Sequence, residues 1–275
     1  DSNAVALGYA CTASGSNSVS IGNASTALGK SSVAIGRGAS ANGFASVAIG
    51  YHNGATGSYS TAIGDHNLAS GTNSTSFGYY ASTNGHAGSF IYADASSSTT
   101  NTNSTADNQF MVKASGGTIF YSNSTLTSGV SLAAGGGAWS TVSDRRMKEN
   151  FEKVNGNEIL KKIAEMPITN WNYKTQSKNI RHIGPMAQDF YKSFGFGESD
   201  TTITSVDIDG INMVAIQALI EKTNELNKKA AQIEELKATI KKLKNNNDAL
   251  EARVNAMENA IDKNLKTFSM APEKK

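Results

Sequence analysis

A glycine stands at every seventh position from residue 8 to residue 85, and no position in this series is missed. The residue two positions before each glycine is always alanine, serine or threonine. The residue directly before the glycine is mostly apolar in one period and polar in the next, with Leu28 as the exception, so the full repeat spans 14 residues. Because a glycine in every heptad would destabilise a helix, this period does not indicate a coiled coil.

The short runs between the glycines, such as SVAIG at 32–36, are rich in β-branched and small residues. These runs predict strands stacked as the coils of a β-solenoid. We expect glycine to supply the corners that need a positive φ angle, and the small residue to be required by crowding near a central axis. A coil of 14 residues encloses little core, so three chains packed side by side would share an interior of Ile and Val. The alternative, a flexible Gly/Ser linker, would not keep phase.

Charge is divided unevenly along the chain: Asp, Glu, Lys and Arg occur only seven times before residue 143. The net charge of +2 favours neither nucleic acid nor an anionic membrane as a partner. The lone cysteine, Cys11, excludes an intrachain disulfide and is expected to be a packed thiol. No apolar run is long enough to span a membrane, and no signal peptide stands at the start. Because the chain opens in phase with the repeat, we expect it to be part of a longer protein.

The period is lost after residue 88, and residues 89–142 are expected to form a β-rich neck. Within it, NQFMVKASGGTIFYSN at 108–123 predicts two strands around a turn at Gly116 and Gly117. The stretches on either side are rich in Ser, Thr, Asn and Gly and predict loops.

From residue 143 the sequence becomes charged and helix-prone, which predicts an α+β domain over 143–220. The expected order is a helix at 155–166, a strand at 168–173, then a strand, a turn and a helix over 180–198, and a long final helix.

The long helix carries apolar residues at coiled-coil spacing. The a positions are Ile233, Ile240, Asn247, Val254 and Ile261, and the d positions are Leu236, Leu243, Leu250, Met257 and Asn264. We therefore expect a coiled coil over 221–265, followed by a disordered tail at 266–275, with Asn247 fixing the register. The alternative is a solvent-exposed single helix.

The glycine repeat resembles the YadA-like head repeats of trimeric autotransporter adhesins over about residues 3–88. The motif is carried by SVAIGRGASANGFASVAIG at 32–50. This resemblance implies a left-handed parallel β-roll in a homotrimer, and three chains in the roll imply three helices in the coiled coil.

The second half resembles the intramolecular chaperone auto-processing domain of endosialidase-type phage tailspikes, over about residues 140–265. The matching segments are SDRRMKEN at 143–150, WNYK at 171–174, IRHIGPMAQDFY at 180–191 and VDIDGINMVAIQAL at 206–219. The resemblance implies a domain that helps a trimeric β-structure to fold and then cuts itself away. It also implies a catalytic dyad of Ser143 and Lys148 and a cleavage site at or beside the Ser143–Asp144 bond.

On the residues alone, Ser143 or Asp144 is the N-cap of a helix, with Lys148 as a solvated charge. The dyad is the alternative, since a serine becomes nucleophilic when a base takes its proton. Lysine acts as that base where desolvation or nearby cations lower its pKa, and Arg145 and Arg146 are such cations. Five residues is a poor spacing on one helix, so an active dyad requires a loop or strand at 143–145.

Other polar and aromatic residues are weaker candidates. His182 would assist proton transfer, oriented by Gln188 or Asp189, or would be a buried structural histidine. Contacts to a receptor are expected at Tyr51, His52, Tyr59 and His66, with packing between coils as the alternative. We expect no metal and no cofactor.

Together these features predict the tip of a homotrimeric surface adhesin or tail-fibre-like protein that is matured by a self-cleaving chaperone. It would act as an enzyme only in a single self-cleaving turnover. Its expected partners are two further copies of the chain and a host-cell or matrix receptor or glycan, with no nucleic acid. Its expected location is the bacterial surface or a virion tail fibre. The alternatives are a phage tail-fibre end and a structural stalk whose trimerisation domain is never cut.

Overall fold

The computed structural model describes residues 3–96 and 100–269. The chain divides into one unit that ends at Glu149 and another that begins at Asn150, and each unit is described by itself. Within the described ranges, no helix combines the length and the apolar character that crossing a bilayer requires.

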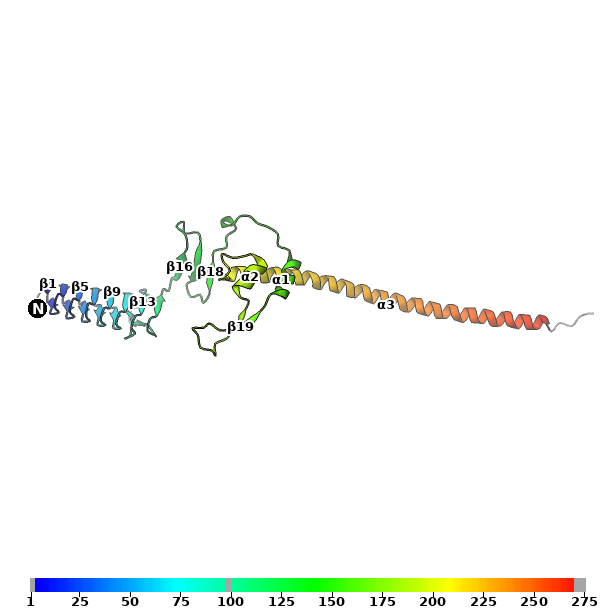
Figure 1. The fold of residues 1–275 in the computed structure, drawn as a ribbon, viewed down its shortest axis with the longest axis horizontal. Coiled ribbons are helices and arrows are strands. Elements are labelled where there is room, and N and C mark those ends of the chain that lie inside the picture. Colours follow the sequence, from blue (N-terminus) through cyan, green and yellow to red (C-terminus); the bar gives the residue numbers. More distant parts are fainter. Residues whose placement is uncertain (1–2, 97–99, 270–275) are drawn as a thin grey trace, which may run out of the picture. The chain divides into compact units, whose positions relative to one another are not determined.

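The first unit begins with a parallel β-solenoid in which long and short strands alternate along the chain (Figure 1). The long strands pair in the order β1-β3-β5-β7-β9-β11-β13-β15, and the short strands in the order β2-β4-β6-β8-β10-β12-β14. The long strands are β1 (Val5–Tyr9), β3 (Val19–Asn23), β5 (Val33–Arg37), β7 (Val47–Tyr51), β9 (Thr61–Asp65), β11 (Thr75–Tyr79), β13 (Phe90–Ala93) and β15 (Phe110–Lys113). The short strands are β2 (Thr12–Ala13), β4 (Thr26–Ala27), β6 (Ser40–Ala41), β8 (Gly54–Ala55), β10 (Leu68–Ala69), β12 (Ala81–Ser82) and β14 (Thr102–Asn103).

The pairing register confirms the predicted 14-residue coil, because equivalent repeat positions lie over one another. Val33 pairs with Val47, for example, and Gly36 with Gly50. The expected crowding of the small residues is also confirmed. Ala34 and Ala41, two positions before their glycines, both have an exposed fraction of 0%. The interior of the coils is therefore lined mostly by Ala and Ser, and larger buried side chains such as Asn53, Asn67 and Ile91 occur at single positions.

The prediction that the repeat glycines form the corners is only half right. Gly36 has a φ of 128°, whereas Gly43 is not in the left-handed region. From Gly8 to Gly78, the left-handed corners lie two residues after each repeat glycine, as at Ala45 and His52, both with a φ of 50°. Gly43 is required by close approach instead, since a Cβ there would lie 2.0 Å from the carbonyl oxygen of Gly57.

The parallel pairing continues past residue 88, where the glycine period is lost. β13 pairs with β11, and β15 pairs with β13, so the solenoid extends into the segment expected to be a neck. Both strands predicted around Gly116 and Gly117 are present, but they do not pair with each other. β15 pairs in parallel with β13, and β16 (Gly117–Tyr121) forms an antiparallel sheet with β17 (Gly129–Ala133), which also pairs with β18 (Trp139–Thr141).

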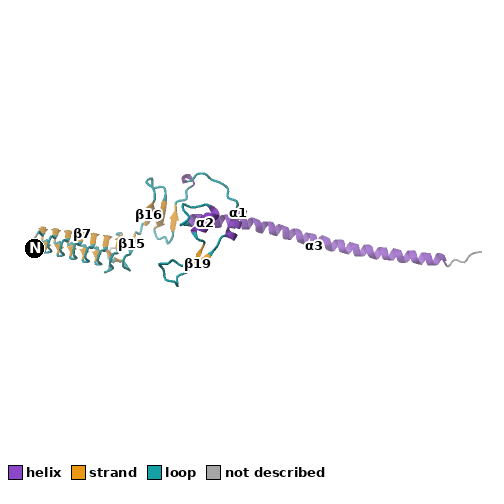
Figure 2. Cartoon of the chain, in the orientation of Figure 1, coloured by secondary structure: helices purple, strands orange, loops and turns teal. Residues whose placement is uncertain are grey.

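The second unit is a small α+β domain that leads into a long helix, as the colours of Figure 2 show. Its elements are α1 (Gly156–Glu165), β19 (Thr169–Trp171), β20 (His182–Gly184), α2 (Ala187–Phe194) and α3 (Ser205–Ser269). Their order is the one that the sequence predicts. The N–H groups of residues 157 and 158 donate to the side chain of Asn155, which caps α1.

The core of the second unit lies where α1 and α2 pack on the first turns of α3. Its buried members are Ile159, Phe190, Phe194, Ile211 and Ala215. Farther along α3, the apolar residues at the predicted coiled-coil positions from Ile233 to Ile261 are each more than half exposed. Ile240, for example, has an exposed fraction of 63% and Leu236 one of 61%. Such a stripe on a single helix is an uncovered apolar surface.

Candidate functional site

The segment after β18 brings the two predicted dyad residues together. Lys148 Nζ donates a hydrogen bond to Ser143 Oγ over 2.7 Å. Ser143 lies outside any helix or strand and is followed by Asp144, whose backbone is extended, and by a short 3₁₀ turn, η1 (Arg145–Met147). Lys148 lies directly after that turn. This conformation solves the spacing problem that an α-helix would have created, because the turn folds the chain back between the two side chains.

Asp144, and not Ser143, is the cap of this turn. Its carboxylate accepts a hydrogen bond from the backbone N–H of Arg146 at 2.9 Å. The guanidinium of Arg146 donates to both carboxylate oxygens, with Nη2 to Oδ2 at 2.6 Å. These bonds lower the pKa of Asp144. The cap and the serine–lysine contact are therefore made by adjacent residues and do not exclude each other.

The arrangement supplies a nucleophile and a neighbouring amine, but in an exposed setting. Ser143 and Lys148 are both exposed in the single chain, and the lysine is the donor of their hydrogen bond. A lysine serves as a base when it is neutral, which desolvation favours. Arg146, one of the two cations expected to favour the neutral amine, is paired with Asp144 instead.

His182 lies in the second unit, on β20, among aromatic side chains. Its Nε2 is 2.9 Å from Gln176 Oε1, so Gln176 takes the place of the expected partners Gln188 and Asp189. The ring centroids of Trp171 and Tyr173 lie 4.8 Å and 5.5 Å from that of His182. This surrounding fits a structural histidine.

The predicted contact residues fall on two different corners of the solenoid. His52 stacks on His66 with centroids 5.2 Å apart, and His66 stacks on Tyr80 at 4.7 Å. Tyr51 meets His66 edge-on at 5.3 Å. We call Tyr51, His52, His66 and Tyr80 the corner stack.

Tyr59 lies apart from the corner stack, on the corner formed by the other turn of each coil. There it packs edge-on against Phe44, with centroids 5.2 Å apart. The addition of Tyr80 could have been predicted, because it lies 14 residues after His66.

The imidazoles of the corner stack are engaged within the protein. His66 Nδ1 contacts the carboxylate of Asp65. The ring of His52 lies against Gly38, where a Cβ would come within 2.7 Å of Nδ1. In the described part of the chain, no group of three or more His, Cys, Asp or Glu side chains could hold a metal ion.

Cys11 is a half-buried free thiol at the start of the solenoid. Its Sγ lies 3.2 Å from the Ser25 hydroxyl and 3.2 Å from the Gly22 carbonyl oxygen. The bond to Ser25 lowers the pKa of the thiol. The thiol of Cys11, which was expected to be packed, is thus only partly buried.

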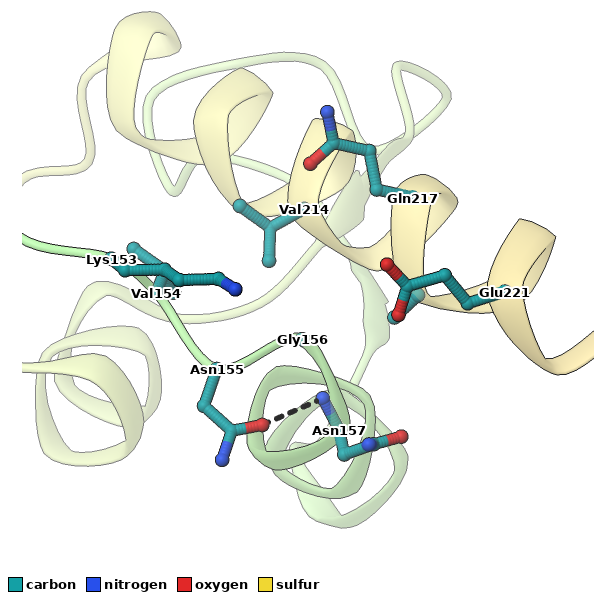
Figure 3. Close-up of a pocket in the computed structure, with 9 residues that line it drawn as sticks. Lys153, Val154, Asn155, Gly156, Asn157, Val214, Gln217 and Glu221 are labelled. Carbon is teal, nitrogen blue, oxygen red and sulfur yellow. Dashed lines mark hydrogen bonds between the residues drawn. The ribbon is translucent and has the colours of Figure 1, made fainter.

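A pocket of about 380 Å³ lies between the start of α1 and α3 (Figure 3). Its lining comprises Lys153, Val154, Asn155, Gly156, Asn157, Val214, Gln217, Ala218 and Glu221. A Cβ on Gly156 would lie 2.7 Å from the Cβ of Ala218. These small residues set the close approach of α1 to α3.

Comparison with known families finds a match in each half of the chain. The YadA head domain repeat matches residues 2–25, 13–39, 41–67 and 69–87. The chaperone of endosialidase, a peptidase family, matches residues 143–196, so its first residue is Ser143. Both resemblances inferred from the sequence are confirmed, although the second match ends before the long helix. The chain therefore contains YadA head repeats over residues 2–87 and a chaperone-of-endosialidase domain over residues 143–196.

Proposed function

We propose that this chain is the tip of a homotrimeric surface adhesin or tail-fibre-like protein, and that the part following Ser143, which contains the second unit, is an intramolecular chaperone that assembles the trimer and is cut away at Ser143. The combination of families points to an adhesin or fibre with a chaperone domain. We further propose that the assembly contains three chains, that the β-roll is left-handed, and that the chain cleaves itself at Ser143.

The outer face of the long-strand sheet is the observation that carries the proposal. Val33 and Ile35 flank the buried Ala34, so their side chains point to the opposite face and remain partly exposed. The pairing repeats this pattern from coil to coil, which builds continuous apolar columns. The pattern is inverted relative to an ordinary sheet, with small residues inside and large apolar ones outside. Such columns favour burial against further copies of the same chain.

The exposed stripe of α3 supports assembly through the second unit. Leu236, Ile240 and Leu243 are each more than half exposed and follow the heptad spacing. Parallel solenoids shared among three chains need distant segments to pair in one register, which folds slowly. A coiled coil that forms first would align the chains.

The contact between Lys148 and Ser143 supports self-cleavage as the final step. Once the chaperone is removed, an unfolded head lacks the template that aligned it, so its stability becomes kinetic. The reaction would be a single turnover in each chain. Truncation before Ile233 should slow the cut, because it removes most of the coiled coil but leaves the dyad.

Denaturing mass analysis of three variants tests the dyad. Ser143→Ala and Lys148→Ala should each leave the chain full length while light scattering still gives a trimer. Lys148→Arg should also fail to cut, because a guanidinium does not release its proton near neutral pH. A trimer of Lys148→Arg that cuts at the wild-type rate would dispose of the lysine as the base.

Contact with a host-cell or matrix receptor or glycan is proposed for the corner stack, with Tyr59 as a separate contact on the other corner. Weak contacts repeated on three chains would bind a multivalent surface better than a soluble monovalent ligand. Replacing Tyr51, His52, Tyr59 and His66 with alanine should reduce adhesion to cells or matrix. Unchanged adhesion by a properly folded trimer would contradict this site.

A further inference from the structure

The dyad and the bond it is proposed to cut belong to the same residue, which restricts how they can react. This inference rests on the proposed cleavage between Ser143 and Asp144. Attack by Ser143 Oγ on its own carbonyl carbon would close a four-atom ring through Oγ, Cβ, Cα and C. Bond angles in such a ring would have to fall well below the ordinary backbone value of about 111°. The strain rises roughly with the square of that deviation, so this route is closed.

Other routes within one chain do not give the same product. Attack by Ser143 Oγ on the preceding carbonyl carbon, that of Val142, forms an unstrained ring. It would break the Val142–Ser143 bond instead and leave Ser143 at the start of the released domain. The carboxylate of Asp144 is a second candidate nucleophile. Its two oxygens accept hydrogen bonds from the backbone and guanidinium of Arg146, which hold it at the cap of the turn.

In the single chain, Ser143 Oγ and the neighbouring amine of Lys148 have no reachable carbonyl carbon whose attack would break a Ser143–Asp144 bond. Ser143 and Lys148 are in contact, yet both are exposed, and no desolvating wall surrounds the lysine within the described part of the first unit. A second chain laid against this segment would bring both missing features, a reachable carbonyl and the exclusion of water.

We propose that cleavage occurs between protomers: Ser143 and Lys148 of one copy cut the Ser143–Asp144 bond of a neighbouring copy in the trimer. The active site then exists only after assembly. This supplies a physical reason for a monomer to remain uncut.

The step balances without a further reactant except water. Neutral Lys148 takes the proton of the Ser143 hydroxyl as Oγ bonds to the carbonyl carbon of the partner's Ser143. The carbon–nitrogen bond to the partner's Asp144 breaks, and the lysine ammonium returns its proton to the leaving amine. Water then hydrolyses the ester that joins the two chains. The serine hydroxyl is restored, and the partner's cut chain ends in a carboxylate.

Mixed trimers test the proposal directly. Wild-type chains and tagged chains carrying Ser143→Ala are produced together and assembled at random, and each chain type is weighed under denaturing conditions. The variant keeps the bond after position 143 and loses only its own nucleophile. In a cyclic trimer every bond faces one neighbour, so the cut fraction should equal the wild-type fraction for both chain types, about half in an equal mixture.

The outcomes separate this inference from the proposed function. Complete cutting of wild-type chains with intact variant chains would overturn attack between protomers. A cut between Val142 and Ser143, visible in the fragment masses, would also overturn it, in favour of attack within a chain. If homotrimers of the wild type remain full length, the cleavage itself fails. Variant chains assembled alone are the control and should stay intact while trimeric.

Discussion

Replacing Gly43 with alanine separates two reasons for a repeated glycine. Gly43 does not adopt a left-handed φ, so alanine suits its backbone. The added Cβ, however, would lie 2.0 Å from the carbonyl oxygen of Gly57 and 2.5 Å from its carbonyl carbon. Ordinary contact between such atoms is about 3.5 Å. Neighbouring coils would therefore have to open by about 1 Å or more, where strands normally stand about 4.8 Å apart.

The cost follows from comparable overpacking in protein cores. One added methyl group in a filled interior typically costs about 1–3 kcal/mol. Each chain of a trimer would carry the same lesion, so the assembly would lose roughly 3–9 kcal/mol. We expect the melting temperature of the head to fall by several degrees, measured by circular dichroism.

Gly85→Ala is the matched control for this prediction. Gly85 has a φ of 82°, and a Cβ there would meet no atom within 4 Å. The control therefore carries backbone strain alone, about 1 kcal/mol per chain. Gly43→Ala should be the more damaging change despite its ordinary φ. Equal stability of the two variants, or the reverse order, would refute crowding between coils as the reason for the glycine.

Three further changes test other parts of the structure. Asn247→Ile should raise the stability of the coiled coil while loosening its chain number, and unchanged stability and light scattering would contradict the heptad assignment. Hydrogen bonds from Ser115 lower the pKa of Asp94 in the folded chain. The ionised carboxylate therefore contributes to the free energy of unfolding above its unfolded pKa of about 4, and this contribution is lost as the pH falls toward the folded pKa. Asp94→Asn should therefore flatten the acid dependence of melting below about pH 4, and an unchanged profile would count against this contact. Gly156→Ala should lower the urea concentration at the unfolding midpoint of the second unit, because the added methyl group pushes α1 away from Ala218. An unchanged midpoint would show that α1 and α3 accommodate the methyl group without loss of stability.

The solenoid could be predicted in detail because its constraint is local and repeated. The spacing of glycines and small residues determines coil length, and coil length determines which residues lie over one another. Ala34 and Val33 illustrate this, since alternation alone separates the buried from the exposed side chain. The sequence did not indicate which repeat glycines have a positive φ angle and which are required by close approach. That depends on how closely neighbouring coils approach, as at Gly43.

Pairing and capping were harder to predict because they depend on competition between neighbours. The composition of β15 is typical of a hairpin strand, but β15 pairs in parallel with the edge of β13 instead. At the candidate site, Ser143 and Asp144 are both good caps by residue type. Arg146 decides between them, because it can bind a carboxylate at two oxygens and cannot do so with a hydroxyl.

Intact mass analysis of freshly assembled wild-type protein under denaturing conditions tests the central claim most directly. Self-cleavage at Ser143 predicts two fragments, residues 1–143 and residues 144–275, that appear only after light scattering detects a trimer. Denaturing conditions matter because trimer contacts could hold the fragments together after the cut. A single full-length mass from a properly assembled trimer at near-neutral pH would contradict self-cleavage and leave Ser143 as a residue beside a capped turn.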